Sequence, residues 1–283
     1  MNAKILSFNV ANSLEDEKKP EFRFGARLEK ICDLIRSKEP DIVCIQEIRE
    51  CLDPSGTYIM SAFEIASRMA RMTNLFVAGV FMVNPSSITF ARSILYNPNR
   101  FFPLQCWGEW CSHTPYVPSG GSMHRPKNIG VGVQYGIFAN IIDREKCILG
   151  DERILIANMH YPLKLNEKLY TNKYLLKKIP EISGGMNTII CGDFNTYFET
   201  EGTQQLDELK SKFCCVSDHI PITYSTFPYW EKTINSKLDH VLTYPHDRFI
   251  TKVDATDITI NWESDHYLIE IDYNSHDIDY NDL

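Results

Sequence analysis

The sequence predicts an α/β protein in which two β-sheets pack face to face and helices cover the outside. Strand-like and helix-like segments alternate along all 283 residues, and no Gly/Ser-rich linker divides the chain. The strand-like segments outnumber the helical ones, which favours two packed sheets over a single doubly wound sheet. We therefore expect one domain over residues 1–275, followed by an acidic tail over residues 276–283.

Alternating or continuous apolar runs mark the expected strands, and apolar residues at helical spacing mark the expected helices. The strands are expected near residues 3–10, 41–46, 75–83, 88–96, 131–142, 153–160, 188–191, 213–217, 237–243, 248–254 and 266–273. The helices are expected at 24–35, ended by Pro40, at 61–73, opened by a Ser61–Glu64 capping box, at 165–179, stopped by Pro180, and at 203–210.

The composition is that of a globular protein, with 43% hydrophobic and 23% charged residues. The net charge of −8 argues against a broad electrostatic grip on long nucleic acid. It does not exclude phosphate chemistry, because a bound divalent cation can supply positive charge locally. No apolar run is long enough for a transmembrane helix, and the N-terminal residues are too polar for a signal peptide.

The cysteine pattern indicates reduced thiols. The nine cysteines are an odd number, and no two of them form a Cys-x-x-Cys pair. Cys44 and Cys191 lie within apolar strand-like runs, where a cysteine usually serves as a small core residue. We therefore expect an intracellular protein, cytoplasmic or nuclear, without disulfides or a zinc site, and we expect a monomer.

The stretch Thr188–Thr196 reads Thr-Ile-Ile-Cys-Gly-Asp-Phe-Asn-Thr and is the most informative in the chain. Its apolar first half predicts a buried strand, which Gly192 is expected to break with a tight turn. Asp193 and Asn195 follow two positions apart, on the same side if the chain stays extended. They would present a carboxylate and an amide at the strand end, or they would simply cap a turn.

Similar polar groups end or interrupt several other expected strands. Each one alone has an ordinary structural explanation, and together they would converge only if the strand ends share one edge. The groups are Asn9, Glu47, His160, Asp239 and the pair Asp265-His266.

This ordered set resembles the endonuclease/exonuclease/phosphatase superfamily, the deoxyribonuclease I-like metal-dependent phosphoesterases. The resemblance runs from about Lys4 to Tyr273, and its elements are Asn9, Gln46-Glu47, His160, Gly192-Asp193-Phe194-Asn195, Asp239 and Ser264-Asp265-His266. It implies a four-layered α/β sandwich of two mixed sheets, with the active site at one edge.

The resemblance also implies a divalent metal site. Glu47 would be a hard oxygen ligand for Mg²⁺ or Mn²⁺, and Asn9 would help to place the metal and its waters. Asp265 is expected to contribute to the metal site and to fix the tautomer and orientation of His266.

The remaining roles implied by the resemblance concern proton transfer and phosphate contacts. Asp193, held by Asn195, would position or deprotonate the attacking water. His266 would contact a phosphoryl oxygen or act as general acid or base. His160, if protonated, would bind a second phosphoryl oxygen, and Asp239 would orient a histidine or assist the metal site.

A second Ser-Asp-His sequence competes with this assignment. Ser217-Asp218-His219 is followed by Ile-Pro, but it precedes Asp239 in the chain. In the superfamily the motif follows that aspartate and opens the last strand. The order therefore favours Asp265 and His266 as the working pair.

Residues 97–128 carry five prolines and no clear period, which predicts a long irregular loop and a candidate specificity element. Its aromatic side chains would stack on bases, and its basic ones would meet phosphates, or the aromatics would pack and the charges would be solvated. The candidate contacts are Trp107, Trp110, Tyr116, His124, Arg125 and Lys127.

The expected function is a metal-dependent phosphodiesterase, most simply a nuclease acting on DNA or RNA. His160 replaces the tyrosine of the abasic-site endonuclease branch, and the Trp-Cys-Asp-Arg element of inositol-polyphosphate 5-phosphatases is missing before Asp239. Deoxyribonuclease-like, deadenylase-like and sphingomyelinase-like branches remain. The alternatives are a phosphatase or phospholipase C-like enzyme on inositol phosphates or phospholipids, and a non-catalytic binding protein on the same fold.

Overall fold

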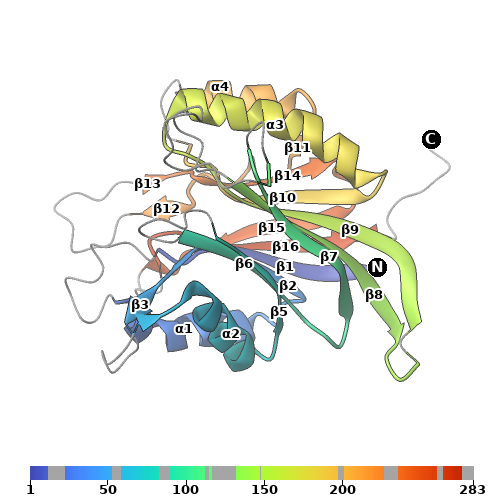
Figure 1. Ribbon diagram of the computed structural model, residues 1–283. Helices are drawn as coiled ribbons and strands as arrows, with labels where there is room; N and C mark the ends of the chain where they lie inside the picture. The colour runs from blue at the N-terminus through green and yellow to red at the C-terminus, as the bar shows by residue number, and fades with distance from the viewer. Residues whose placement is uncertain are drawn as a thin grey trace.

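The fold is a four-layered α/β sandwich, as the sequence predicts (Figure 1). It comes from a computed structural model, in which two six-stranded mixed sheets face each other and helices cover both outer faces. The structure describes residues 1–11, 23–52, 59–82, 90–111, 115–116, 132–146, 148–196, 201–225, 235–259 and 264–275. The acidic tail expected over residues 276–283 lies outside these ranges.

The first sheet has the strand order β15-β16-β1-β2-β6-β5. Its strands are β1 (Asn2–Asn9), β2 (Ile42–Arg49), β5 (Phe76–Met82), β6 (Phe90–Tyr96), β15 (Ile250–Thr256) and β16 (Leu268–Asn274). β1 and β2 are parallel and the other neighbours are antiparallel. The short strands β3 (Cys51–Leu52) and β4 (Ile59–Met60) pair separately.

The second sheet has the order β11-β14-β10-β9-β8-β7. Its strands are β7 (Phe101–Trp110), β8 (Gly132–Asp143), β9 (Ile148–His160), β10 (Asn187–Asp193), β11 (Cys214–Cys215) and β14 (Asp239–Tyr244). β9 and β10 are parallel and the other neighbours are antiparallel. A further pair, β12 (Tyr224–Ser225) with β13 (Asn235–Ser236), forms a separate two-stranded sheet.

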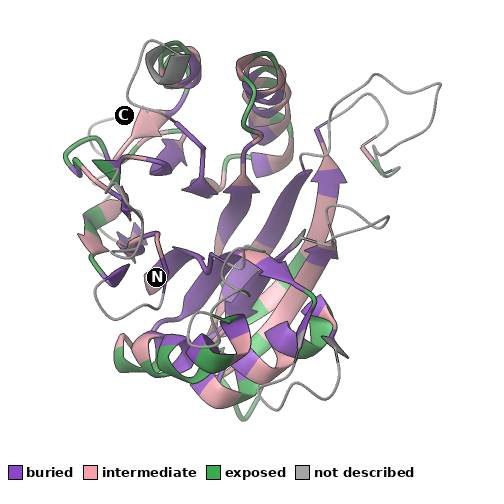
Figure 2. Cartoon of the chain, turned by 90° about the vertical axis from the view of Figure 1, so that its left-hand side faces the viewer, coloured by how far each residue is buried: buried purple, intermediate pink, exposed green. Residues whose placement is uncertain are grey.

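Three apolar layers hold the sandwich together. One lies between the first sheet and helices α1 (Phe24–Ser37) and α2 (Ala62–Thr73), and one lies between the two sheets. The third lies between the second sheet and helices α3 (Leu165–Ser183) and α4 (Glu201–Lys210), at the top of Figure 1. Figure 2 shows the layers from the side, with buried ribbon between the outer helices.

The Ser61 capping box is confirmed at the start of α2. The Ser61 side chain accepts a hydrogen bond from the Glu64 backbone at 3.2 Å, and the Glu64 carboxylate accepts one from the Ser61 backbone at 2.8 Å. This reciprocal pair satisfies two donors that a helix start otherwise leaves unpaired.

Two predictions about irregular backbone were wrong. Residues 101–110 form strand β7 rather than a loop, because an edge strand tolerates the missing donor of Pro103 with a shift in register at that point. Helix α3 continues through Pro180 to Ser183. The side chains of Ile179 and Ser183 are buried on either side of the proline, so packing outweighs the lost backbone hydrogen bond.

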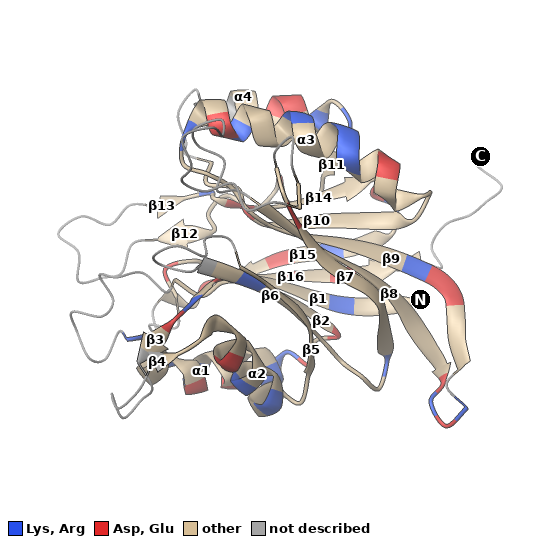
Figure 3. Ribbon diagram, in the orientation of Figure 1, with Lys and Arg blue, Asp and Glu red and all other residues tan. Residues whose placement is uncertain are grey.

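Charged residues gather on the outer helices and at the β8–β9 turn, while most strand ribbon is uncharged (Figure 3). In the described part of the chain no helix is long and apolar enough to cross a membrane. Eight cysteines fall in the described ranges, and all eight are free thiols.

Candidate active site

The ends of four strands meet at one edge of the sandwich, on the left in Figure 1. The parallel pairs β1–β2 and β9–β10 both end there and carry Asn9, Glu47, His160 and Asp193. Within the second sheet, Asp193 is in register with His160 on one side and with Asp239, which starts the antiparallel strand β14, on the other. The expected convergence of strand ends is therefore present in the fold.

The side chains on the inner faces of these strands change from apolar to polar toward that edge. Alternate residues of β9 read Ile154, Ile156, Asn158 and His160, from the apolar core to an amide and then to an ionisable group. Three other strands also pass from apolar to polar residues toward this edge: Ile5-Ser7-Asn9 on β1, Ile42-Cys44-Gln46 on β2 and Ile189-Cys191-Asp193 on β10. The apolar layer thus provides a rigid base for the polar cluster.

Gly192 lies within β10, so the expectation that it breaks the strand was wrong. Its φ of 137° suits glycine alone, and a Cβ atom there would lie 2.1 Å from the carbonyl oxygen of Met159. The glycine lets β9 and β10 approach closely, which brings Asp193 next to His160.

Asn9 joins the two sheets at the cluster. Its Nδ2 donates to Glu47 Oε1 at 3.2 Å and to Asp193 Oδ2 at 3.0 Å, while its Oδ1 accepts the Ala11 backbone N–H at 2.9 Å. Glu47 adopts a left-handed φ of 61° at an irregularity in the β2–β6 pairing, which directs its carboxylate to this point. In this arrangement Asn9 turns nitrogen rather than oxygen toward the carboxylates, so it positions them.

Asp193 is the central group of the cluster and is 2% exposed. Asn195, also in a left-handed conformation, donates its backbone N–H to Asp193 Oδ1 at 2.7 Å, and its side chain is anchored to the Tyr161 carbonyl. Burial, together with the Asp239 and Glu47 charges, raises the pKa of Asp193 to about 7, although His266 opposes the shift. A carboxyl group with this pKa can exchange a proton near neutral pH.

His266 is held by Asp239. The imidazole Nδ1 lies 2.8 Å from Asp239 Oδ2, and Nε2 lies 3.7 Å from Asp193 Oδ2. Burial lowers the pKa of His266, but the charges of Asp239 and Asp193 outweigh it and raise the pKa well above its ordinary value. The resemblance assigned the tautomer and orientation of His266 to Asp265, and gave Asp239 the role of orienting a histidine or assisting the metal site. In the structure Nδ1 lies within hydrogen-bonding distance of Asp239.

Neighbouring hydroxyl groups fix these two residues. Ser264 Oγ donates to the Asn9 carbonyl at 2.7 Å and accepts the His266 backbone N–H at 3.1 Å, which ties the last strand to the first. Thr223 Oγ1 accepts the Asp239 backbone N–H at 2.8 Å. Ser264 of the Ser264-Asp265-His266 sequence therefore helps to position His266.

His160 faces the carboxylates, with Nε2 3.7 Å from Glu47 Oε1 and 3.5 Å from Asp193 Oδ2. Burial, the charge of Arg92 and the charge of His266 lower the pKa of His160 to about 3. These effects favour the neutral imidazole at neutral pH, whereas the contact considered from the sequence used the protonated form.

The cluster suits a divalent metal ion. Ligand atoms of Glu47, His160 and Asp193 lie within 4.8 Å of one another, and a second such group joins Asp193, Asp239 and His266. Carboxylate oxygens are ligands for Mg²⁺ and Mn²⁺, and an imidazole nitrogen is compatible with Mn²⁺. The donor set therefore fits the metal that the sequence resemblance implies.

The two described tryptophans expected to bind substrate pack against neighbouring aromatic rings. Trp107 packs on Tyr135 with ring centroids 5.0 Å apart, and Trp110 packs on Phe81 at 4.8 Å, which is the packing alternative considered from the sequence. Arg125 and Lys127, with His124, lie outside the described residues.

The competing Ser-Asp-His sequence is engaged elsewhere. Asp218 is half exposed and pairs with Lys210 of α4 at 2.6 Å, while His219 Nε2 lies 2.8 Å from the Val253 carbonyl. Asp218 and His219 thus tie neighbouring elements together, and of the two candidate histidines it is His266 that lies in the cluster.

A buried amide network beneath the cluster was not anticipated. Gln46 Nε2 donates to Asn158 Oδ1 at 2.8 Å across the two sheets, and Asn158 Nδ2 donates to the carbonyls of Ile45 and Ser93. Both side chains are fully buried. The signal for Asn158 was its place two residues before His160, on the same face of the strand.

Comparisons with known proteins agree with this fold. A relative in Acanthamoeba polyphaga mimivirus, uncharacterized protein L388, is 25% identical over 217 residues, which is 74% of this chain and 75% of that protein. An endonuclease/exonuclease/phosphatase from Bacteroides vulgatus superposes with a TM-score of 0.71 at 14% identity, over 96% of this chain and 98% of that one. The mannosyl-6-phosphatase Bt3783 of Bacteroides thetaiotaomicron gives 0.65 at 17% identity, over 95% and 98%.

The structural likenesses, at these identities, speak for the fold alone. The family model is more specific: it matches residues 6–266, a range that begins within β1 and ends at His266. It therefore spans every residue of the cluster described above. The chain belongs to the Endonuclease/Exonuclease/phosphatase family, whose members are hydrolases acting on phosphate esters.

Proposed function

We propose that this protein is a divalent-metal-dependent phosphodiesterase that hydrolyses DNA or RNA. The observation that carries the proposal is the convergence of Asn9, Glu47, Asp193 and His266 from both sheets within hydrogen-bonding or ion-pairing distance. A binding scaffold would gain nothing from burying two carboxylates beside a neutral and a charged imidazole, because such burial costs free energy.

A Mg²⁺ or Mn²⁺ ion held by Glu47, with Asp193 and His160 close by, would neutralise phosphate charge as the reaction proceeds. Asn9 keeps the Glu47 and Asp193 carboxylates at a fixed spacing. Asp265, adjacent to His266 in the chain, remains proposed as a further contributor to the metal site.

Asp193 positions a water molecule and accepts its proton, since its raised pKa places it near neutrality. Asn195 keeps that carboxylate in place through its backbone N–H. His266, charged and oriented by Asp239, contacts a phosphoryl oxygen or donates a proton to the leaving oxygen. His160 hydrogen-bonds a second phosphoryl oxygen as a neutral imidazole.

A phosphatase or phospholipase C-like activity on a small or lipid phosphate is the second candidate. The net charge of −8 favours a small substrate over a long polyanion. One protein of the same fold, Bt3783, is described as a mannosyl-6-phosphatase. The same cluster could serve either substrate class, because both reactions place water against a metal-bound phosphate.

A substrate panel separates these candidates. Single- and double-stranded DNA, RNA, poly(A), inositol phosphates and sphingomyelin are incubated with Mg²⁺, with Mn²⁺ and with EDTA. We expect metal-dependent cleavage of a nucleic acid, lost in Glu47→Ala and His266→Ala without loss of folding by circular dichroism.

Turnover that persists in EDTA, or none on any substrate, would refute the proposal. Turnover confined to the inositol phosphates or sphingomyelin would select the second candidate. Full activity in both variants would show that the reaction occurs elsewhere on the protein.

A further inference from the structure

Arg92 is a buried cation that the proposed reaction does not yet use. It lies on β6, two residues before Ile94, whose side chain belongs to the apolar layer between the sheets. Alternation along the strand therefore points Arg92 into the same space, nearer the active-site edge. Its side chain is 2% exposed.

The guanidinium group crosses from the first sheet to the second. Its Nη2 donates to the carbonyl oxygen of His160 at 2.8 Å, at the end of β9. Its Nε and Nη1 are buried and meet no acceptor among the residues that the structure describes. Burying a guanidinium with so few acceptors is costly, so a compensating charge is expected close by.

That compensating charge is the acidic cluster. Asp193 lies within electrostatic range of Arg92, as does the buried thiol of Cys111. Burial lowers the pKa of Arg92 to about 10, so the side chain still carries a full positive charge at neutral pH. Within the described cluster, the other positive charge near Asp193 is that of His266.

We propose that Arg92 is a positioning residue for an anionic substrate: it fixes the strand end that carries His160 and places a permanent positive charge behind the cluster. The inference rests on the proposed function, because it presumes that a phosphate group enters at Glu47, His160 and Asp193. It adds that phosphate is attracted by the protein itself as well as by the metal.

The charge of Arg92 has opposite effects on the binding of phosphate and of a divalent cation. It attracts phosphate and repels a divalent cation, so its removal should weaken the first and leave the second equal or tighter. For a separation of roughly 7–10 Å and an effective dielectric constant of about 20, one charge changes an anion's binding constant by roughly 15- to 50-fold.

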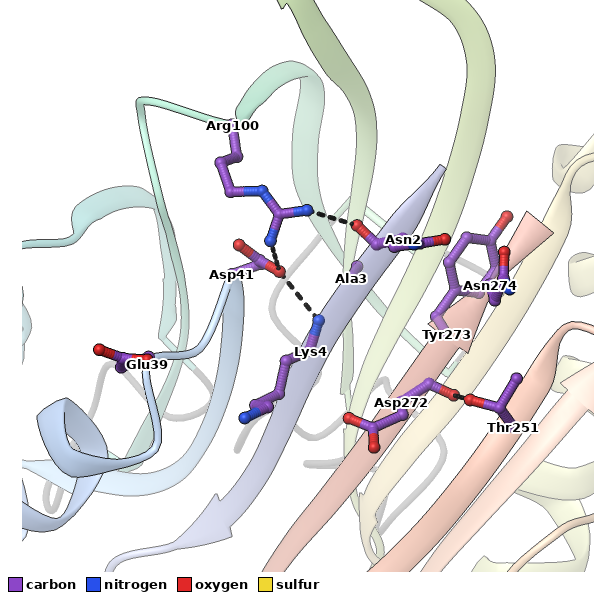
Figure 4. Close-up of a pocket in the computed structure, with 10 residues that line it drawn as sticks. All are labelled: Asn2, Ala3, Lys4, Glu39, Asp41, Arg100, Thr251, Asp272, Tyr273 and Asn274. Atoms are coloured by element: carbon purple, nitrogen blue, oxygen red, sulfur yellow. Dashed lines mark hydrogen bonds and ion pairs between the residues drawn. The ribbon is translucent and has the colours of Figure 1, made fainter. Parts of the chain in front are cut away.

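The test measures binding without turnover, in three variants. Arg92→Met removes the charge, Arg92→Lys keeps it, and Arg100→Met is the matched control. Arg100 lies at the opposite end of β1, where it bonds Asp41 at 2.6 Å and the Asn2 carbonyl at 2.9 Å in a groove of about 450 Å³ (Figure 4). Calorimetry gives the affinity for inorganic phosphate, and the signal of free Mn²⁺ in electron paramagnetic resonance gives the affinity for metal.

In Arg92→Met we expect phosphate affinity, measured with Mn²⁺ saturating, to fall at least tenfold while Mn²⁺ affinity stays equal or rises. Arg92→Lys should restore phosphate affinity to within about threefold, and Arg100→Met should change neither. If Arg92→Met weakens both ligands or neither, the inference is overturned. If Arg92→Met does not fold, Arg92→Gln takes its place, with the same two outcomes. Failure of the unaltered protein to bind Mn²⁺ or phosphate would instead overturn the proposed function, and this inference with it.

Discussion

The pair Asp239–His266 gives the sharpest test of the electrostatics, through the substitution Asp239→Asn. Asparagine has nearly the same size and keeps a neutral oxygen that can accept from His266 Nδ1. What is lost is the negative charge at 2.8 Å, in a pair whose side chains are 3% and 6% exposed.

A hydrogen bond to a charged group is worth about 1.5–3 kcal/mol, and a neutral one about 1 kcal/mol. The substitution should therefore cost about 1–2 kcal/mol while His266 is charged, which lowers the pKa of His266 by about one unit or more. Because the native pKa is raised above the unfolded value, the pair stabilises the fold fully below about pH 6.5. Its contribution disappears as the pH rises through the native pKa.

Imidazole NMR titration of the metal-free protein measures this pKa, with His266→Gln used to assign the resonance. Asp218→Asn is the matched control, because it alters the other Ser-Asp-His sequence at an exposed salt bridge to Lys210. Urea unfolding at pH 5.5 and at high pH reports the matching change in stability. An unchanged His266 pKa in Asp239→Asn, or an equal fall in Asp218→Asn, would refute the assignment.

Three further substitutions test other parts of the account. Glu47→Gln should weaken Mn²⁺ binding at least tenfold by calorimetry, whereas Glu29→Gln on the exposed face of α1 should not; equal affinities would remove Glu47 from the metal site. Gly192→Ala should lower the free energy of unfolding in urea by more than about 3 kcal/mol and abolish turnover, because its Cβ would meet the Met159 carbonyl. The control Gly184→Ala, at a φ of 54° with open space around it, should cost only about 1 kcal/mol. Similar costs for the two variants would contradict the close approach of Gly192 to Met159. Burial lowers the pKa of His240 to about 3, so the free energy of unfolding should fall as the pH drops below about 6.5. Between pH 7 and 4.5, His240→Phe should lose roughly 3 kcal/mol less of this free energy than the unaltered protein. If the two proteins lose stability in parallel, His240 is not buried in its neutral form.

The sequence predicted the two-sheet sandwich because its strands and helices carry strong local patterns. β1, β2, β9 and β10 each carry an apolar or alternating segment that leads to a polar group, and this pattern depends only on neighbouring residues. The edge strand β7 was missed because Pro103 and its two tryptophans carry no period-two signal, and its pairing with β8 is a long-range property.

Residue types at strand ends indicated the members of the cluster, but not their partners. Which carboxylate binds His266 depends on the register of β14 against β10, and that register is set by pairing across the sheet. The direction of the Asn9 amide is likewise decided by the Ala11 backbone. Arg92 could not be identified from the sequence for a similar reason. Its hydrogen bond to the His160 carbonyl joins residues 68 positions apart on two different sheets.

The central claim is that this strand-end cluster hydrolyses phosphate diesters with a divalent metal. The most direct measurement is the rate of phosphodiester cleavage by the unaltered protein and by Asp193→Asn, each titrated with Mn²⁺ and then treated with EDTA. We expect turnover that rises with metal, stops with EDTA and falls at least 100-fold in Asp193→Asn. Cleavage that continues in EDTA, or that proceeds at an unchanged rate in Asp193→Asn, would contradict this claim.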